Sequence, residues 1–230
     1  MFSTYYFGAF TMLPLIILGM IVQARLNSAY SKYSAIGNSK GMTGGQMAEM
    51  ILRSAGIFDV SVVCIDGRLS DHFDPTKKVV RLSREVYEGT SIASVGIAAH
   101  ECGHAIQYHA AYLPIKLRAS VVRITNFSSK ILYLLIFAGL FINTTSSVGT
   151  VIFNVAILCY AVIFFFQLIT LPVEFNASSR AVAQIEGSGF GNEDIKGVKK
   201  VLSAAAMTYV ASAVTALVQL LIMINRSRRR

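Results

Sequence analysis

The chain has 230 residues, of which 54% are apolar and only 14% are charged, and its mean hydropathy is +0.56. Soluble domains carry about 25% charged residues, and disordered chains combine few apolar residues with a high net charge, so this composition excludes disorder and argues against a conventional soluble enzyme. The net charge of +9 comes without the aromatic–basic motifs of nucleic-acid binding, and three scattered cysteines are too few for a disulfide scaffold. We therefore expect a membrane protein that binds no nucleic acid.

Residues 1–24 contain no charged side chain and predict the first transmembrane helix. A bilayer core about 30 Å thick needs roughly 20 apolar residues in helical form. A cleaved signal peptide is the alternative, but it would begin with a basic region, and the start Met1-Phe2-Ser3-Thr4 has no lysine or arginine. The sequence therefore favours a retained helix.

The polar segment 25–130 has the local signals of a small α+β domain. A capping-box pattern at 43–46 predicts a helix over 47–55. Two β-branched runs, 60–65 and 78–82, predict short strands with turn formers between them. The second of these strands either offers an edge for an extended peptide or lies inside an ordinary sheet.

The next predicted helix, from Ile92 to about His109, carries a metal-binding motif. It contains His100-Glu101-Cys102-Gly103-His104. Because four residues advance a helix by about 400°, both imidazoles project from one face and can hold one zinc ion. Glu101 then lies beside the metal, placed to take a proton from a zinc-activated water and pass it to the leaving amine. Two structural histidines on a packed helix are the alternative, and Cys102 is predicted to point away from the zinc and pack.

The second half of the chain alternates apolar and polar segments. The uncharged run 131–173 has 43 residues, which is too long for one crossing and right for two helices joined at the polar stretch 143–147. A polar segment follows over 174–200, then a fourth apolar run over 201–225 and a basic tail over 226–230. The expected fold is therefore a mainly α integral membrane protein with four transmembrane helices and a small α+β domain.

Basic residues predict the orientation in the membrane. With four crossings, segments 25–130 and 174–200 lie on the same side, and together they carry 17 of the 21 lysines and arginines. The positive-inside rule then places this side in the cytoplasm. The four arginines of the tail argue for the opposite orientation.

Catalytic zinc sites usually have three protein ligands, so a third must come from elsewhere in the chain. The candidates are His72, His109, Glu174, Glu186 and Glu193. His109 stands five positions after His104 and faces away on the helix. Glu174 is favoured because it is the first charge after a long apolar run; an interfacial carboxylate paired with Arg180 is its alternative reading.

The motif and the blocks around it resemble the YugP-type membrane neutral zinc metallopeptidases of bacteria, over nearly the whole chain. The segments that carry the resemblance are 71–83, 95–104, 171–180 and 200–209. It implies a gluzincin-like enzyme in which His100, His104 and Glu174 bind zinc and Glu101 is the base. The chain is more distantly similar to the HtpX-type membrane proteases, which use a Glu-x-x-x-Asp sequence after the metal helix. Ser178 stands at the position of that aspartate, so Asp71 or Asp74 is considered as the carboxylate behind a zinc histidine.

Two further side chains are candidates for stabilising the reacting carbonyl oxygen in the transition state. His72 lies in a polar Asp-His-Phe-Asp stretch between the predicted strands, where an exposed turn histidine is the equal alternative. Arg180 could stabilise the same oxyanion, and its alternative is a helix-end charge at the membrane surface.

These features together predict a membrane-embedded zinc metalloendopeptidase, with one zinc ion per chain, in the bacterial plasma membrane. Its substrates are expected to be membrane proteins or membrane-proximal peptide segments, because Glu174 follows directly on an apolar span. A membrane-protein partner could control access to the site. The competing class is a non-catalytic membrane scaffold or chaperone with a structural zinc, but such a site would have four protein ligands and only three good ones are visible.

Overall fold

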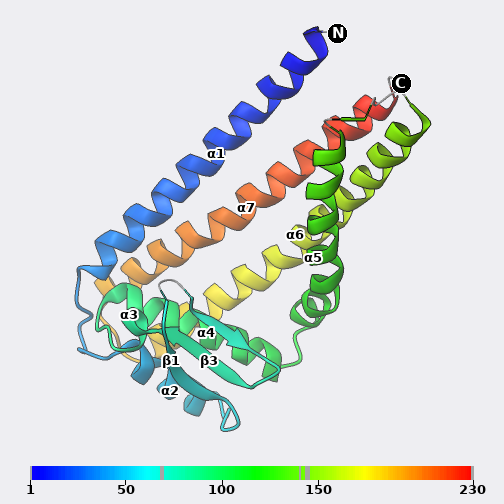
Figure 1. The fold of residues 1–230 in the computed structure, drawn as a ribbon. Helices are drawn as coiled ribbons and strands as arrows, with labels where there is room; N and C mark the ends of the chain where they lie inside the picture. Colours follow the sequence, from blue (N-terminus) through cyan, green and yellow to red (C-terminus); the bar gives the residue numbers. More distant parts are fainter. Residues whose placement is uncertain (1, 68–69, 140, 143–145, 229–230) are drawn as a thin grey trace. The chain divides into compact units, whose positions relative to one another are not determined.

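Long helices dominate the computed structural model, which describes residues 2–67, 70–139, 141–142 and 146–228. Within these residues, four helices are long and apolar enough to cross a membrane: α1 (Phe2–Ser34, with its candidate span at Met12–Ser34), α5 (Leu113–Gly139), α6 (Ser147–Gly187) and α7 (Asn192–Arg228) (Figure 1). The predicted class, a mainly α membrane protein with four spanning helices and a small sheet, is confirmed. Residues 143–145 of the predicted turn between the second and third spans lie outside the described residues.

The second long helix begins much earlier than the uncharged run that predicted it. The backbone leaves α4 (Ile92–His109) through Ala111, which has a positive φ of 54°, and α5 begins at Leu113. Pro114 thus lies in the first turn of α5, where its missing N–H costs no helical hydrogen bond. The helix then continues through four basic residues, Lys116, Arg118, Arg123 and Lys130, before it reaches the apolar run.

The chain divides into two compact units. One comprises residues 17–113 and 173–208, and the other comprises residues 1–16, 114–172 and 209–230. In the second unit, Leu132 of α5 and Ala156 and Cys159 of α6 form a small buried cluster. The first unit holds the sheet, the short helices and every candidate site residue.

The sheet has three strands: β1 (Ser61–Ile65), β2 (His72–Asp74) and β3 (Val79–Ser83). Their order is β1-β3-β2, with β3 parallel to β1 and antiparallel to β2. Two of the strands match the predicted runs, but the third was missed. Residues 72–74 were expected to form a turn; they pair instead with Val79–Arg81, because the turn formers that follow close a hairpin back onto β3. The suggestion that 78–82 offers a free edge is wrong, since β3 is the central strand and β2 lies at the edge.

Local capping signals position the helices of this unit. Helix α2 (Gly44–Ser54) begins with the predicted capping box, in which Thr43 Oγ1 accepts from Gln46 N at 3.1 Å and Gln46 Oε1 accepts from Thr43 N at 2.9 Å. Helix α4 begins after Ser91, whose hydroxyl accepts from Ser94 N at 3.0 Å. A short helix, α3 (Arg84–Tyr87), joins β3 to α4. Both long helix predictions in this unit are therefore confirmed to within a turn.

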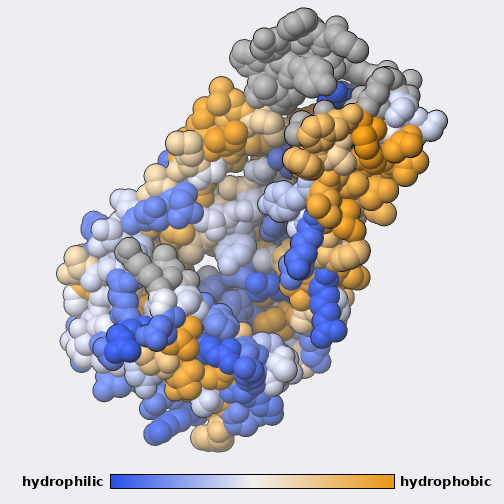
Figure 2. All heavy atoms as spheres, in the orientation of Figure 1, coloured by the Kyte–Doolittle hydropathy of each residue, from blue (hydrophilic) through white to orange (hydrophobic). Residues whose placement is uncertain are grey.

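One apolar core holds the first unit together. It is built from residues of α2, β3 and α4 and from the parts of α1, α6 and α7 in the same unit, including Met47, Ile51, Leu82, Val95, Ile185 and Val198, all of which are essentially inaccessible to solvent. Apolar side chains are also exposed along α5 and α6, whereas many polar side chains lie around the sheet (Figure 2). Exposed apolar residues on such long helices are expected where lipid replaces water.

Candidate metal site

Helix α4 presents both histidines of the motif on one face. The rings of His100 and His104 lie edge to face, with centroids 4.8 Å apart. His104 is buried and His100 is half-buried, so both rings lie on the face of α4 that is turned away from solvent. The i, i+4 spacing therefore places the two imidazoles where one ion could contact both.

Helix α6 supplies the third donor. Glu174 is only 2% exposed, and its Oε2 lies 3.3 Å from His100 Nε2 and 3.7 Å from His104 Nε2. The donor atoms of the three residues all lie within 4.8 Å of one another. Donors that each sit about 2.0–2.1 Å from a tetrahedral zinc are about 3.4 Å apart, so this set of two imidazoles and one carboxylate fits zinc in number, chemistry and spacing.

The electrostatic setting of the cluster also favours a cation. Burial alone would lower the pKa of His104, but the adjacent carboxylate of Glu174 and the negative charge of Glu101 outweigh burial and raise that pKa above its ordinary value. A raised histidine pKa means that its surroundings stabilise positive charge. A bound divalent cation would receive the same stabilisation.

The glycine inside the motif allows α6 to come this close. A Cβ placed on Gly103 would lie 2.5 Å from the backbone oxygen of Ala177, which is closer than real Cβ atoms approach. Gly103 and Ala177 are both buried, one turn along their helices from His100 and Glu174 respectively. The absence of a side chain at Gly103 therefore sets the separation of α4 and α6, and with it the distance from Glu174 to the histidines.

We expect Gly103→Ala to weaken zinc binding and to destabilise the fold. The new methyl group must push α6 away from α4, which costs about 1–3 kcal/mol of unfolding free energy and moves Glu174 away from the imidazoles. Gly187→Ala is the matched control, because a Cβ there meets nothing within 4 Å. Thermal unfolding and zinc content of the two purified variants give the comparison. Native zinc content and stability in Gly103→Ala would contradict this account of the helix contact.

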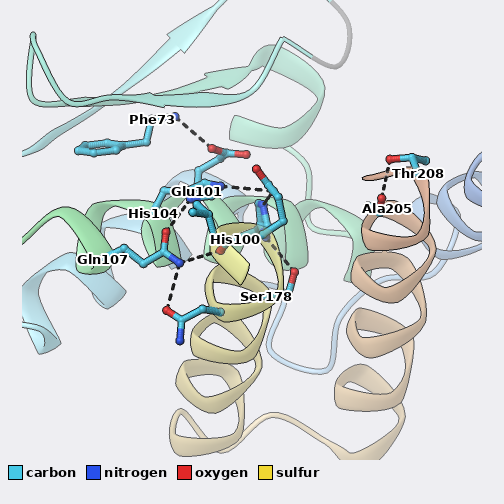
Figure 3. A network of polar contacts seen from close by, with 11 residues as sticks. Phe73, His100, Glu101, His104, Gln107, Ser178, Ala205 and Thr208 are labelled. Carbon is cyan, nitrogen blue, oxygen red and sulfur yellow. Dashed lines mark hydrogen bonds and ion pairs between the residues drawn. The ribbon is translucent and has the colours of Figure 1, made fainter. Parts of the chain in front are cut away.

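Each imidazole of the cluster is held by a hydrogen bond at the nitrogen that faces away from Glu174. His100 Nδ1 lies 3.2 Å from Ser178 Oγ, and His104 Nδ1 lies 3.0 Å from Gln107 Oε1 (Figure 3). Gln107 is itself fully buried and donates its amide to Val173 O at 2.7 Å and to Asn176 Oδ1 at 3.0 Å. These contacts fix the ring orientations and leave both Nε2 atoms directed at Glu174.

Gln107 and Ser178 were not predicted as the partners of the histidines. Asp71, considered for this task, accepts hydrogen bonds from Ser83 N and Oγ instead, and Asp74 accepts from Arg81. Backbone N–H groups and Arg81 also lower the pKa of Asp74, as expected for a carboxylate whose hydrogen bonds are all made within the β2–β3 hairpin. Helical spacing could have indicated both residues, because Gln107 lies three residues after His104 and Ser178 lies four residues after Glu174, each on the same helix face as its metal-site residue.

Glu101 lies beside the cluster without belonging to it. Its Oε2 accepts a hydrogen bond of 3.0 Å from the backbone N–H of Phe73 in β2, and the side chain extends toward that strand in Figure 3. The ring of Phe73 in turn packs against Tyr108 of α4, with centroids 6.0 Å apart. The carboxylate is therefore positioned between the metal-binding face of α4 and the edge strand.

The other predicted candidates lie in different surroundings. Glu186 pairs with Lys199 and Glu193 pairs with Lys196, each at 2.8 Å, and His109 is exposed at the end of α4. Among the described residues, the group suited to a metal therefore contains Glu174 and none of the four alternatives.

His72 and Arg180 are tied to neighbouring residues. His72 lies 2.7 Å from Ser70 O through Nδ1 and 3.2 Å from Arg81 Nη1 through Nε2. Arg180 donates from Nε to Asn176 Oδ1 at 2.8 Å, the same oxygen that accepts from Gln107. Arg180 is thus connected to the metal cluster through two amides, whereas His72 is held on the edge strand.

Cys102 packs away from the cluster. It is fully buried, its Sγ lies 3.5 Å from Ala48 O, and burial raises the pKa of its thiol. A thiol in this state is a packing residue rather than a nucleophile.

Comparison with known proteins agrees with the site. The family model described as "Putative neutral zinc metallopeptidase" matches residues 8–228. The "Putative membrane protease YugP" of Bacillus subtilis (strain 168) is 43% identical over 215 residues, which cover 92% of this chain and 93% of that protein. No solved structure matches significantly. The chain therefore belongs to the neutral zinc metallopeptidase family that this match defines.

Proposed function

We propose that the protein is a membrane-embedded zinc endopeptidase that hydrolyses peptide bonds of membrane or membrane-proximal proteins. The observation that carries the proposal is the convergence of His100, His104 and Glu174 within 4.8 Å, with Glu101 adjacent on α4. One zinc ion per chain is the cofactor, and the three residues are its ligands. When bound, zinc would lower the pKa of a water molecule and polarise the scissile carbonyl.

Other residues of the chain transfer the proton and position the metal ligands. Glu101 takes a proton from the attacking water and gives it to the leaving amine. Gln107 and Ser178 hold the imidazoles so that each presents Nε2, and Glu174 neutralises part of the charge of the cation. Buried surroundings strengthen each of these electrostatic contributions, because little water screens them.

We assign the stabilisation of the developing oxyanion first to Arg180 and second to His72. Arg180 donates to Asn176, whose neutral amide does not cancel the charge of the guanidinium. The Nε2 atom of His72 accepts from Arg81 and must change partner before it can donate to an oxyanion. Donors directed at charge that develops in the transition state are a major source of rate enhancement.

A scaffold or chaperone with a structural zinc is the competing function. Structural zinc sites close four positions with protein ligands, whereas catalytic sites keep one position open. The three donors of the cluster favour catalysis.

Metal analysis together with a cleavage assay tests the proposal. The purified chain in detergent should contain about one zinc per molecule and should cleave an unfolded protein. Removal of the metal by a chelator should abolish cleavage, and added zinc should restore it. A zinc-replete chain with no activity on unfolded or membrane-bound proteins would support the scaffold instead, and equal activity without metal would overturn the mechanism.

We further propose that the site faces the cytoplasm, on the bacterial plasma membrane. The proposal rests on the 17 of 21 basic residues in the segments 25–130 and 174–200. The exposed Cys64 of β1 is a native reporter of this side, because Cys102 and Cys159 are buried. In intact cells an impermeant thiol reagent should leave Cys64 unlabelled, and it should label a cysteine that replaces the exposed Ser147. The reverse pattern would mean that the basic tail sets the orientation.

A further inference from the structure

A basic pocket lies between α1 and α7 in the unit that contains the metal site. It is open to solvent, has a volume of about 530 Å³ and is lined by Arg25, Lys199, Lys200 and Ser203, with Val22 and Met207 among its apolar residues. None of these residues has a role in the proposed peptidase chemistry. The pocket therefore needs an explanation of its own.

Both helices that form the pocket change from charged to uncharged residues, α1 toward its N-terminus and α7 toward its C-terminus. Arg25 is the first charged residue after 24 uncharged ones, and Lys200 is the last before the 25 uncharged residues of 201–225. Within the pocket, Val22 lies on the apolar side of Arg25, and Met207 lies on the apolar side of Lys200. Because α1 and α7 run in opposite directions in this unit, their basic ends coincide (Figure 1). The pocket thus passes from a cationic end to an apolar end, at the level where each helix leaves its apolar run.

Close packing of the two helices forms the pocket before any ligand arrives. A Cβ placed on Gly197 of α7 would lie 2.8 Å from the ring of Tyr33 of α1, so the helices are in direct contact there. Tyr30, Val201 and Leu202 are buried in the same core. A preformed site loses little conformational entropy on binding.

Two positive charges of the pocket remain after the ion pair of Lys199 with Glu186, which lies outside the lining, is counted. Lys199 Nζ lies 2.8 Å from Glu186 Oε1, which offsets one of the three cations. Arg25 and Lys200 supply the remaining charges, and the hydroxyl of Ser203 lies beside them in the pocket. A guanidinium, an ammonium and a hydroxyl together match the donors that phosphate oxygens require.

We propose that this pocket binds the phosphate headgroup of an anionic phospholipid, with Val22 and Met207 against the adjoining acyl chains. Basic pockets between transmembrane helices on the cytoplasmic side are suited to anionic headgroups. A free phosphate ion would use the basic end alone and would leave the apolar end of the pocket without a partner. The amphipathic lining therefore favours a lipid over a soluble anion, and the inference does not depend on the peptidase activity.

Lipid retention by the full chain in detergent tests the proposal. Short-chain phosphatidylglycerol and phosphatidylcholine are added separately, and bound lipid is counted by native mass spectrometry. The native chain should retain phosphatidylglycerol in preference to phosphatidylcholine. Arg25→Gln with Lys200→Gln should weaken phosphatidylglycerol binding about thirtyfold, and each single variant should weaken it about fivefold, since a basic residue near an anionic surface contributes on that scale.

Lys196→Gln is the matched control, because Lys196 is an exposed lysine of α7 outside the pocket that pairs with Glu193. It should retain lipid as the native chain does, and circular dichroism melting shows whether each variant is folded. Equal retention of the two lipids by the native chain overturns the proposal, as does unchanged retention in folded single variants. Displacement of the lipid by an equal concentration of inorganic phosphate would assign the pocket to a free anion and would also overturn it.

Discussion

Glu101→Gln is expected to lower the rate of peptide hydrolysis by a factor of about 10² to 10⁴ while zinc content stays unchanged. Glutamine keeps the size and the helix propensity of glutamate but cannot accept the proton of the attacking water. The amide oxygen can still accept the 3.0 Å hydrogen bond from Phe73 N, so the local structure should persist. Cleavage of an unfolded protein and the zinc-to-protein ratio are measured on the same preparation.

Glu49→Gln provides the control for that measurement. Glu49 is an exposed glutamate of α2, and the same change of charge there should leave both activity and zinc content as they are. Retained turnover in zinc-replete Glu101→Gln would show that another group is the base. Loss of zinc from Glu101→Gln would instead make Glu101 part of the metal site.

Glu174→Ala is expected to lose zinc, with affinity reduced by more than about 100-fold. Loss of a hydrogen-bond partner behind a ligand already costs about 10–100-fold in metal affinity, and Glu174 would contact the ion itself. Its carboxylate is 2% exposed and is held on a long helix whose spacing from α4 is fixed at Gly103. Two imidazoles alone would then bind the ion weakly.

Glu186→Ala and His109→Ala are the paired controls, and both should retain zinc. Glu186 has its own partner in Lys199, and His109 lies exposed at the end of α4. The measurement is the metal-to-protein ratio of the three purified variants after dialysis. Full zinc occupancy in Glu174→Ala, with loss in either control, would move the metal site away from α6.

Local spacing along the chain was enough to predict α2, α4, the four spanning helices and half of the site. The capping box at Thr43 predicted α2 to within a turn, because a cap satisfies backbone donors only a few residues away. The i, i+4 spacing of His100 and His104 predicted two imidazoles on one face for the same reason, since helical geometry is a local property. The uncharged runs predicted four spanning helices, because the thickness of a bilayer sets their length.

The tertiary structure decided what depends on residues that are far apart in the chain. Ser178 and His100 are 78 positions apart, and the sequence could not show that α4 and α6 approach closely enough at Gly103 for them to meet. The sequence favoured Glu174 among five candidates for the third ligand, and in the described residues only Glu174 of the five lies beside both imidazoles.

Strand order and the start of α5 were likewise decided by packing. A strand of three residues, β2, has too short a pattern to be distinguished from a turn, and its hydrogen bonds to β3 define it. The start of α5 was not predicted, because its first turns carry charged residues. An uncharged run shows where a helix is apolar, not where its hydrogen bonds begin. Periodicity and capping act over a few residues, whereas the meeting of α4, α6 and β2 around Glu101 and Glu174 depends on how the whole core packs.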